Sequence, residues 1–237
     1  AQAEIQRLTD IYNHQIAGGK WRNMMSDNPH GLLKAEQAAA GQNDFKPDSA
    51  AKADDENSEV EKQAVPANFP ADGFVEQHGW LVMAAAHAST FVPGRDAHWR
   101  KITGLGYRGE AVGVDPTLVP VPATVPQILS ESPVLQYDLW VRHPGDWTFT
   151  VRALPTFSVV TGQPPRYAIA VDDAPPQIIS LPAATSENDR QWQEDVLRNA
   201  ALTSSVHTIA RPGRHVLKIW MVDPGVVLDT IIGHGGT

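Results

Sequence analysis

The 237-residue sequence contains no cysteine, so disulfide bonds and thiolate-ligated metal sites are excluded. It contains no apolar run of about 18 residues, and no transmembrane helix is expected. Positive charge is scarce, because 19 Lys and Arg residues face 27 Asp and Glu residues, for a formal net charge of −8. Since nucleic-acid binding depends on Lys and Arg that neutralise phosphates, we expect neither nucleic acid nor membrane as a partner.

Long helices are excluded from the middle of the chain by proline. Eleven of the 19 prolines lie between Pro116 and Pro176. Each removes a backbone donor and breaks a helix. This stretch is therefore predicted to consist of short strands and turns.

The N-terminal residues have the spacing of one amphipathic helix, over residues 4–17. Gly18-Gly19 would end it, because glycine accepts the left-handed conformation of a helix C-terminus. The apolar face recurs at intervals of three and four and consists of Ile5, Leu8, Ile11, Tyr12 and Ile16. Either this face docks on the rest of the chain or its natural partners are missing, and we favour the second alternative.

Residues 31–67 change in composition and are predicted to be a flexible acidic linker. Their acidic residues outnumber large apolar ones, of which Phe45 and Val60 stand out. Such a segment cannot bury enough apolar surface to offset the entropy of ordering.

Residues 68–237 have the pattern of an all-β domain. Leu135, Tyr137, Leu139 and Val141 alternate with polar residues, as do Trp147, Phe149 and Val151 after the turn 143–146. The alternation predicts a hairpin with one buried face. A second hairpin is predicted over 206–222, around the turn 211–214. Several short strands with Pro/Gly turns and no intervening helices predict a mainly β, jelly-roll-like sandwich.

No convincing catalytic or metal-ligating set is present. Gly104–Gly109 matches G-x-G-x-x-G, but the prolines that follow leave no room for the helix of a dinucleotide site, so a tight β-loop is predicted. Asp172-Asp173 is an adjacent carboxylate pair of the β-domain, and a turn is the simpler interpretation than catalysis. His87 and His98 lack the spacing of metal ligands. We expect no metal and no cofactor from these patterns.

Aromatic side chains in polar segments are the candidates for sugar binding. Trp99 and Trp192 lie among charged and polar neighbours, and Tyr107 lies in the glycine loop. Exposed aromatic rings suit stacking on sugar rings or on a neighbouring domain. Packing inside the domain remains the alternative for each of them.

Segments 12–25, 98–106 and 213–229 together resemble glycoside hydrolase family 115, the xylan α-1,2-glucuronidases. The resemblance implies that residues 1–30 are the terminal helix of an upstream helical domain, with Tyr12, Trp21 and Met24 in interdomain packing. It also implies that residues 68–237 are the C-terminal β-sandwich. The family's catalytic carboxylates lie in an upstream TIM barrel, so none can be assigned here. We expect the chain to be truncated at both ends.

Segments 144–152 and 227–229 also resemble the carbohydrate-binding modules of families 6 and 35. Many of those modules hold a structural calcium ion through acidic residues near their first and last strands. Asp229 matches the second acidic position. The early strand reads Ala84–His87 and departs from the pattern, because it carries no carboxylate.

The resemblance implies a non-catalytic accessory module of a xylan α-glucuronidase that packs on or dimerises the catalytic part. The alternative is a module that holds glucuronoxylan through Trp99, Tyr107 and Trp192, and an independent hydrolase is the third hypothesis. Implied partners are the upstream catalytic domains, xylan and a second copy of the enzyme. Because xylan does not enter cells, a secreted or periplasmic location is expected.

Overall fold

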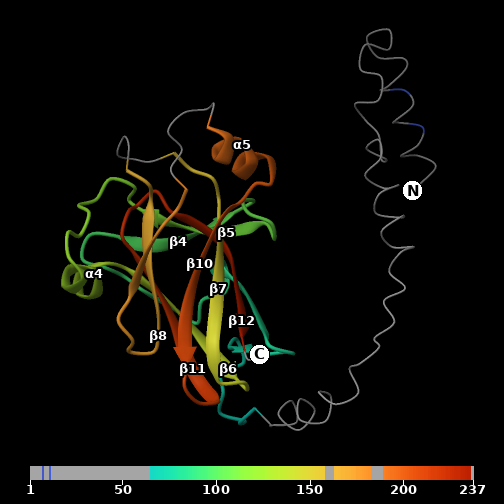
Figure 1. Ribbon diagram of the computed structural model, residues 1–237. Coiled ribbons are helices and arrows are strands. Elements are labelled where there is room, and N and C mark those ends of the chain that lie inside the picture. The colour runs from blue at the N-terminus through green and yellow to red at the C-terminus, as the bar shows by residue number, and fades with distance from the viewer. Residues whose placement is uncertain (1–6, 8–10, 12–64, 158–162, 183–188, 236–237) are drawn as a thin grey trace. The chain divides into compact units, whose positions relative to one another are not determined.

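The computed structural model describes Arg7, Ile11 and residues 65–157, 163–182 and 189–235 (Figure 1). The chain divides into two units, Ala1–Ala53 and Asp54–Thr237. The predicted N-terminal helix, apart from Arg7 and Ile11, lies outside the described residues. So do the packing residues Tyr12, Trp21 and Met24 and nearly all of the predicted linker. The account below concerns residues 65–235.

Short strands dominate this part of the chain. In chain order the elements are β1 (Phe74–Val75), β2 (Trp80–Ala84), the 3-10 helix η3 (Ala85–His87), β3 (Thr90–Val92), β4 (His98–Thr103), β5 (Glu110–Asp115), α4 (Val125–Glu131), β6 (Val134–Val141), β7 (Gly145–Ala153), β8 (Arg166–Val171), β9 (Gln177–Ser180), α5 (Arg190–Leu197), β10 (Ala201–Ile209), β11 (Gly213–Met221) and β12 (Val227–Gly235).

The strands form two six-stranded sheets. Sheet A has the order β1-β6-β11-β8-β9, with β3 also paired to β6. Sheet B has the order β10-β7-β12-β5-β4, with β2 also paired to β12. The two sheets pack face to face, which confirms the predicted β-sandwich.

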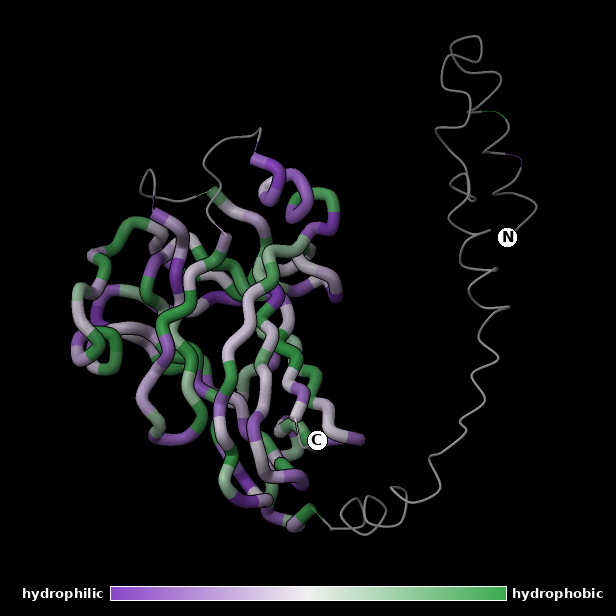
Figure 2. Tube along the Cα trace, in the orientation of Figure 1, coloured by the Kyte–Doolittle hydropathy of each residue, from purple (hydrophilic) through white to green (hydrophobic). Residues whose placement is uncertain are grey.

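One hydrophobic core fills the space between the sheets. The alternating residues of β6, including Leu135, Tyr137 and Leu139, face Trp147 and Phe149 of β7 across it. Figure 2 shows the same alternation as green and paler segments along the strands. The Tyr137 hydroxyl donates to the Ala85 carbonyl at 2.9 Å. Burial raises the pKa of Tyr137 far above its usual range, so this phenol stays neutral in the core.

Both predicted hairpins are wrong in their pairing. β6 lies in sheet A and β7 in sheet B, so the turn 142–144 carries the chain from one sheet to the other. Likewise, β10 lies in sheet B and β11 in sheet A. β6 pairs instead with β11, and β7 pairs with β10 and β12. The pattern identified strands and buried faces, but each partner strand is distant in sequence.

The loop 104–109 does join a true hairpin, between β4 and β5. Gly104 N donates to the Gly109 carbonyl at 2.7 Å and closes it. A strand follows the loop, which confirms the tight β-loop and excludes the helix that a dinucleotide site requires.

Two short helices, α4 and α5, interrupt the strands, although none was predicted. The Thr124 hydroxyl caps α4 by accepting from Gln127 N at 3.4 Å, and proline in the first turn suits a helix start. Ile128 of α4 packs with Val134, Ala168 and Trp220 in a second, smaller apolar cluster. That contact covers part of the outer face of sheet A.

Candidate functional site

The glycine loop is held to the domain by a buried ion pair. Asp229 is the extra residue of a β-bulge in β12, where the register with β7 shifts between Leu228 and Thr230. Its carboxylate is buried and accepts from Arg152 Nε at 2.8 Å and from Tyr107 N at 3.1 Å. Charge-assisted bonds of this kind are the strong ones, so Asp229 fixes the loop to β12.

Gly106 is required at this contact. Its φ of +82° lies in the region that favours glycine, and an added Cβ would lie 2.6 Å from Asp229 Oδ1. Gly104 and Gly109 share a positive φ, but an added Cβ would meet nothing there within 4 Å. Close approach to Asp229 therefore distinguishes Gly106 from the other two.

Tyr107 projects from the loop next to Gly106. Its side chain is 77% exposed, and the guanidinium carbon of Arg152 lies 5.5 Å from its ring centroid. That distance allows a cation–π interaction. Tyr107 is thus held in position by Arg152 while most of its ring stays available to a ligand.

Arg152 also reaches the end of α5. Its Nη2 donates to the carbonyls of Arg198 and Asn199, at 3.3 and 3.1 Å. α5 starts at the N-cap Asp189, whose carboxylate accepts from Gln191 N at 2.9 Å. One arginine therefore connects the glycine loop, the bulge of β12 and the C-terminal end of α5.

Trp192 lies on α5 and is half-buried. Its ring centroid lies 4.2 Å from that of the exposed Phe157, with the planes tilted by 37°. An aromatic pair of this geometry has an attractive contact beyond simple burial. Trp192 and Tyr107 are thus carried by two elements that both contact Arg152.

Trp99 does not belong to this group, and the expectation that it is exposed is wrong. It is 4% exposed in the core, and its indole N–H donates to the Pro133 carbonyl at 3.0 Å. The polar neighbours that suggested exposure, His98 and Arg100, point to the other face of β4, because successive side chains of a strand alternate.

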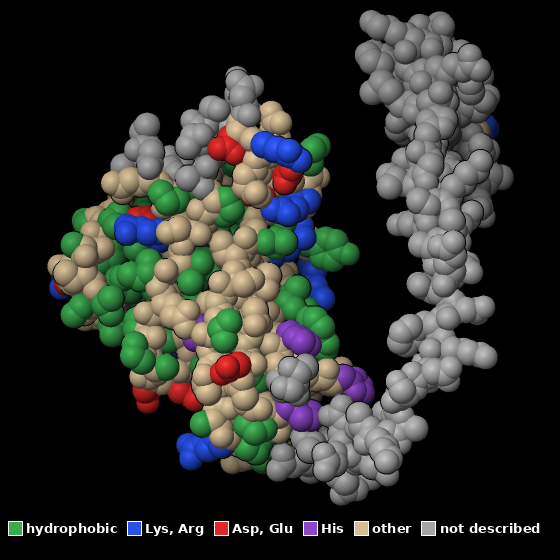
Figure 3. Space-filling model, in the orientation of Figure 1, with side chains coloured by type: hydrophobic (Ala, Val, Ile, Leu, Met, Phe, Trp, Pro, Cys, Tyr) green, Lys and Arg blue, Asp and Glu red, His purple; other side chains and the backbone are tan. Residues whose placement is uncertain are grey.

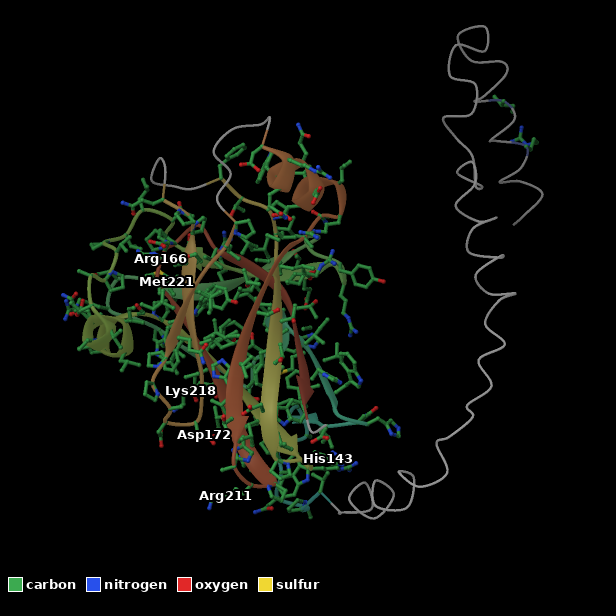
Figure 4. The ribbon with its side chains drawn as sticks, viewed as in Figure 1. His143, Arg166, Asp172, Arg211, Lys218 and Met221 are labelled. Carbon is green, nitrogen blue, oxygen red and sulfur yellow. The ribbon has the colours of Figure 1, made fainter. Side chains whose placement is uncertain are left out.

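Asp172 and Asp173 do not form a catalytic pair. Asp172 accepts from Val216 N at 2.9 Å through one oxygen, and its other oxygen lies 2.7 Å from His215 Nδ1. Asp173 pairs with Lys218 Nζ at 3.0 Å. Figure 4 shows Asp172 and Lys218 near the end of β8 opposite Arg166. Both carboxylates serve the turn after β8, as the simpler interpretation predicted.

The residues around Asp229 do not fit a calcium ion. Its two oxygens are engaged by the Arg152 guanidinium and the Tyr107 amide, and calcium needs six to eight oxygen ligands. Residues 84–87 supply no carboxylate. Within the described ranges, no group of three or more His, Asp or Glu residues is placed to hold a metal ion.

A cavity of about 410 Å³ lies beside the loop after β5. It is mostly apolar and is lined by 117–121, Gln163, Pro165 and 223–225. Its acidic residue, Asp223, forms a two-oxygen ion pair with Arg166, at 2.8 and 3.2 Å. This cavity therefore offers no free carboxylate for acid–base chemistry.

The two packed sheets define a mainly β sandwich domain, with aromatic side chains on a loop and on a short helix. The chain belongs to glycosyl hydrolase family 115, because residues 73–236 match the model of its C-terminal domain. No curated protein matches the chain.

The solved structures to which the chain is similar include an enzyme of the same family and two carbohydrate-binding modules. A family GH115 4-O-methyl-α-glucuronidase with specificity for decorated arabinogalactans is 22% identical, with a TM-score of 0.54. The alignment covers 99% of this chain but 24% of that protein. The C-terminal CBM6 of the laminarinase LamC from Zobellia galactanivorans is 13% identical, with a TM-score of 0.43, over 66% of this chain and 99% of that one. A family 35 module from Clostridium thermocellum is 12% identical, with a TM-score of 0.44, over 65% and 98%.

Proposed function

We propose that this chain is a non-catalytic accessory module of an α-glucuronidase, which packs on the catalytic part of the enzyme. The observation that supports this is the state of its carboxylates. Asp229, Asp172 and the fully buried Glu76 are engaged by Arg152, His215 and His143. A glycosidase needs two carboxyl groups that flank the sugar, one as acid and one as base or nucleophile.

A release assay tests the non-catalytic part of this proposal. The 237-residue chain is incubated with glucuronoxylan and with a glucuronic acid-decorated arabinogalactan, and free glucuronic acid is measured. We expect no release above the buffer blank. Release that is lost in Asp172→Ala would contradict the proposal and favour an independent hydrolase.

The proposed place of action is outside the cytoplasm, in a secreted or periplasmic enzyme, because hemicellulose polymers do not enter cells. No helix of the described part of the chain is long and apolar enough to cross a bilayer. Xylan is the polymer proposed from the sequence resemblance. Decorated arabinogalactan is the second polymer to test, because a structurally similar enzyme is specific for it.

Carbohydrate binding is the second candidate function, favoured by the exposure of Tyr107. In this proposal Tyr107 and Trp192 stack on sugar rings, as aromatic side chains in glycan sites do. Trp99 is not available for this role, because its ring is buried. Arg152 would then be a positioning residue that holds the loop and α5 in place.

Affinity electrophoresis tests this second function. We expect retardation of the parent chain in gels that contain glucuronoxylan, and its loss in Tyr107→Ala and Trp192→Ala. Trp80→Ala, which removes an exposed tryptophan from β2, is the matched control and should migrate like the parent. The same gels are run with decorated arabinogalactan, and unretarded migration of the parent in both polysaccharides would rule out binding.

A further inference from the structure

The outer faces of the two sheets differ in charge. On sheet A, Arg214 pairs with Asp138 at 2.8 Å and Lys218 pairs with Asp173 at 3.0 Å, and α4 covers another part of the face. Charged pairs are typical of a face that meets water, and α4 already covers another part of sheet A. On the outer face of sheet B, charged side chains lie at Asp146 and Arg152 of β7. Among the described residues, the two rows of side chains between them carry neither a charged pair nor a helix.

We name this area the uncharged face. Strand register places its side chains in two rows across β2, β12, β7 and β10. The first row is Trp80, His234, Thr148 and Val206, and the second is Val82, Ile232, Thr150 and Ser204. Neither row contains Lys, Arg, Asp or Glu. In Figure 3 the surface over β10 and β7 is mostly tan with isolated green side chains.

Large apolar side chains mark both ends of the uncharged face. Trp80 is 48% exposed and its ring centroid lies 4.2 Å from that of His234, while Val206 at the other end is 53% exposed. Val82, in the second row, is also exposed. Next to Trp80 is a groove of about 520 Å³, lined by Gly73, Phe74, Val75, Gln77, His78, Trp80 and Val82. Trp80 and Val82 continue the lining of this groove, and an exposed apolar area of this kind is typical of an interaction site.

The size of the uncharged face selects the kind of partner. Four strands about 4.8 Å apart, with side chains of one face repeating every ~6.8 Å, give roughly 400 Å² including the margins. The two partners together would bury about 800 Å², below the ~1,200 Å² of stable complexes between separate proteins. A buried area of about 800 Å² lies within the ~600–1,500 Å² of interfaces between domains of one chain, where covalent linkage supplies a high effective concentration.

The chain path agrees with a partner on the same polypeptide. The first strand, β1, contributes Phe74 and Val75 to the groove beside Trp80. The chain before it passes sheet A, where the Phe69 ring lies 5.8 Å from that of Trp140, and then reaches the edge of the uncharged face at β1. The family relative is about four times longer than this chain, since the alignment covers 24% of it.

We propose that the uncharged face is the surface through which this domain packs on the catalytic part of its own enzyme, with Trp80 and Val206 as main contacts. This inference rests on the proposed function and specifies its interface. Trp80 is suited to be a main contact, because tryptophan is enriched among the residues that contribute most of the binding energy of interfaces. A short acidic side chain at Val206 would be buried without a partner and weaken the contact.

The test uses the 237-residue chain and the polypeptide encoded upstream of Ala1, produced separately and mixed in a calorimeter. We expect binding by the parent chain, and a dissociation constant at least tenfold higher for Trp80→Ala and for Val206→Asp. Leu118→Asp is the matched control at an exposed position outside the two rows of the face, and should bind like the parent. Leu118 is 83% exposed, so its substitution tests for a general effect of added charge.

The outcomes separate this inference from the proposed function. If the parent binds and the Trp80 and Val206 variants bind equally well, packing occurs through another face and the inference is wrong, while the proposed function stands. If the parent does not bind, or no catalytic region is encoded upstream, both are wrong. Sedimentation of the chain alone adds one outcome: a dimer abolished by Val206→Asp would assign the face to a second copy.

Thermal stability of the isolated chain is the folding control for the Trp80 and Val206 variants. Thermal unfolding of Val206→Asp and Trp80→Ala is expected to stay within a few degrees of the parent, because exposed substitutions change stability little. Unfolding of either variant at room temperature would contradict the proposal, since the face would then serve the domain's own fold.

Discussion

Asp229 is buried in β12 with one carboxylate oxygen 2.8 Å from Nε of Arg152. The pair bridges two neighbouring strands of sheet B at a bulge and holds the amide of Tyr107 on the second oxygen. The glycine loop that carries the exposed Tyr107 is therefore anchored by a charge inside the domain.

Removing the cation of this pair should destabilise the domain. Arg152→Met leaves the buried Asp229 carboxylate uncompensated, and we expect a loss of about 3 kcal/mol of unfolding free energy. Arg214→Met removes the cation of the exposed pair with Asp138 and should cost less than about 1 kcal/mol. Urea unfolding measures both, and equal losses would contradict the buried character of the Arg152–Asp229 pair.

Chelation should not affect stability. Asp229 uses both oxygens for the Arg152 guanidinium and the Tyr107 amide, so no calcium ion is needed to neutralise it. We expect the same melting temperature in millimolar EDTA and in millimolar calcium chloride. A rise of several degrees on adding calcium would show that the cation binds the folded domain.

The loop glycines should differ in their tolerance of a methyl group. Gly104→Ala adds only the cost of a positive φ, about 1 kcal/mol. Gly106→Ala adds the same cost and a contact of 2.6 Å with Asp229 Oδ1, so its loss should be clearly larger. The two variants are compared by chemical denaturation. Equal losses would mean that the loop moves away from Asp229 without penalty.

Substitution of the buried Trp99 should reduce stability much more than substitution of the exposed Tyr107. Trp99→Ala creates a core cavity and is expected to cost about 3–5 kcal/mol. Tyr107→Ala, at an exposed position, should cost about 0.5 kcal/mol or less apart from its contact with Arg152. Thermal melts of both variants decide this, and a stable Trp99→Ala protein would contradict the core position.

Mild acid should destabilise the domain through His207. This histidine is buried in β10, with Nε2 2.9 Å from the Ser205 hydroxyl, and burial lowers its pKa below the ordinary value. The unfolded chain, with a pKa near 6.5, then binds the proton more readily. Stability is therefore full above about pH 7 and falls as pH drops through 6.5, until the folded pKa is reached.

A variant isolates this contribution. His207→Gln keeps a polar group beside Ser205 but does not titrate. The urea midpoint of the parent should fall more between pH 7.5 and 5.5 than that of His207→Gln. The same fall in both proteins would assign the pH dependence to other groups.

Periodicity in the sequence predicted the strands and their buried faces, but not their partners. The inner faces of both sheets carry the same alternation, so Leu135–Val141 and Trp147–Val151 look like the two arms of a hairpin. The turn between them changes sheets, and nothing in residue pattern distinguishes a corner from a hairpin turn. The short helices were missed for a related reason, since α4 begins within a proline-rich stretch.

The candidate site was predicted in part. Tyr107 followed from the glycine loop, and Trp192 from a polar segment that forms a capped helix. Trp99 was misinterpreted, although its alternation with His98 and Arg100 is the pattern of a strand with one inward residue. Arg152 was missed, because a lone arginine in an alternating strand gives no signal until β12 brings Asp229 beside it.

The connections from β6 to β7 and from β10 to β11 each cross from one sheet to the other, and this constrains how the domain folds. β6 and β11 become neighbours only after the roughly seventy residues between them have been placed, and those residues include all of β7 and β10. Neither sheet can assemble from a contiguous stretch of chain. Slow, all-or-none assembly is expected from pairings so distant in sequence, and a protease cut between β9 and β10 would leave no half able to persist alone.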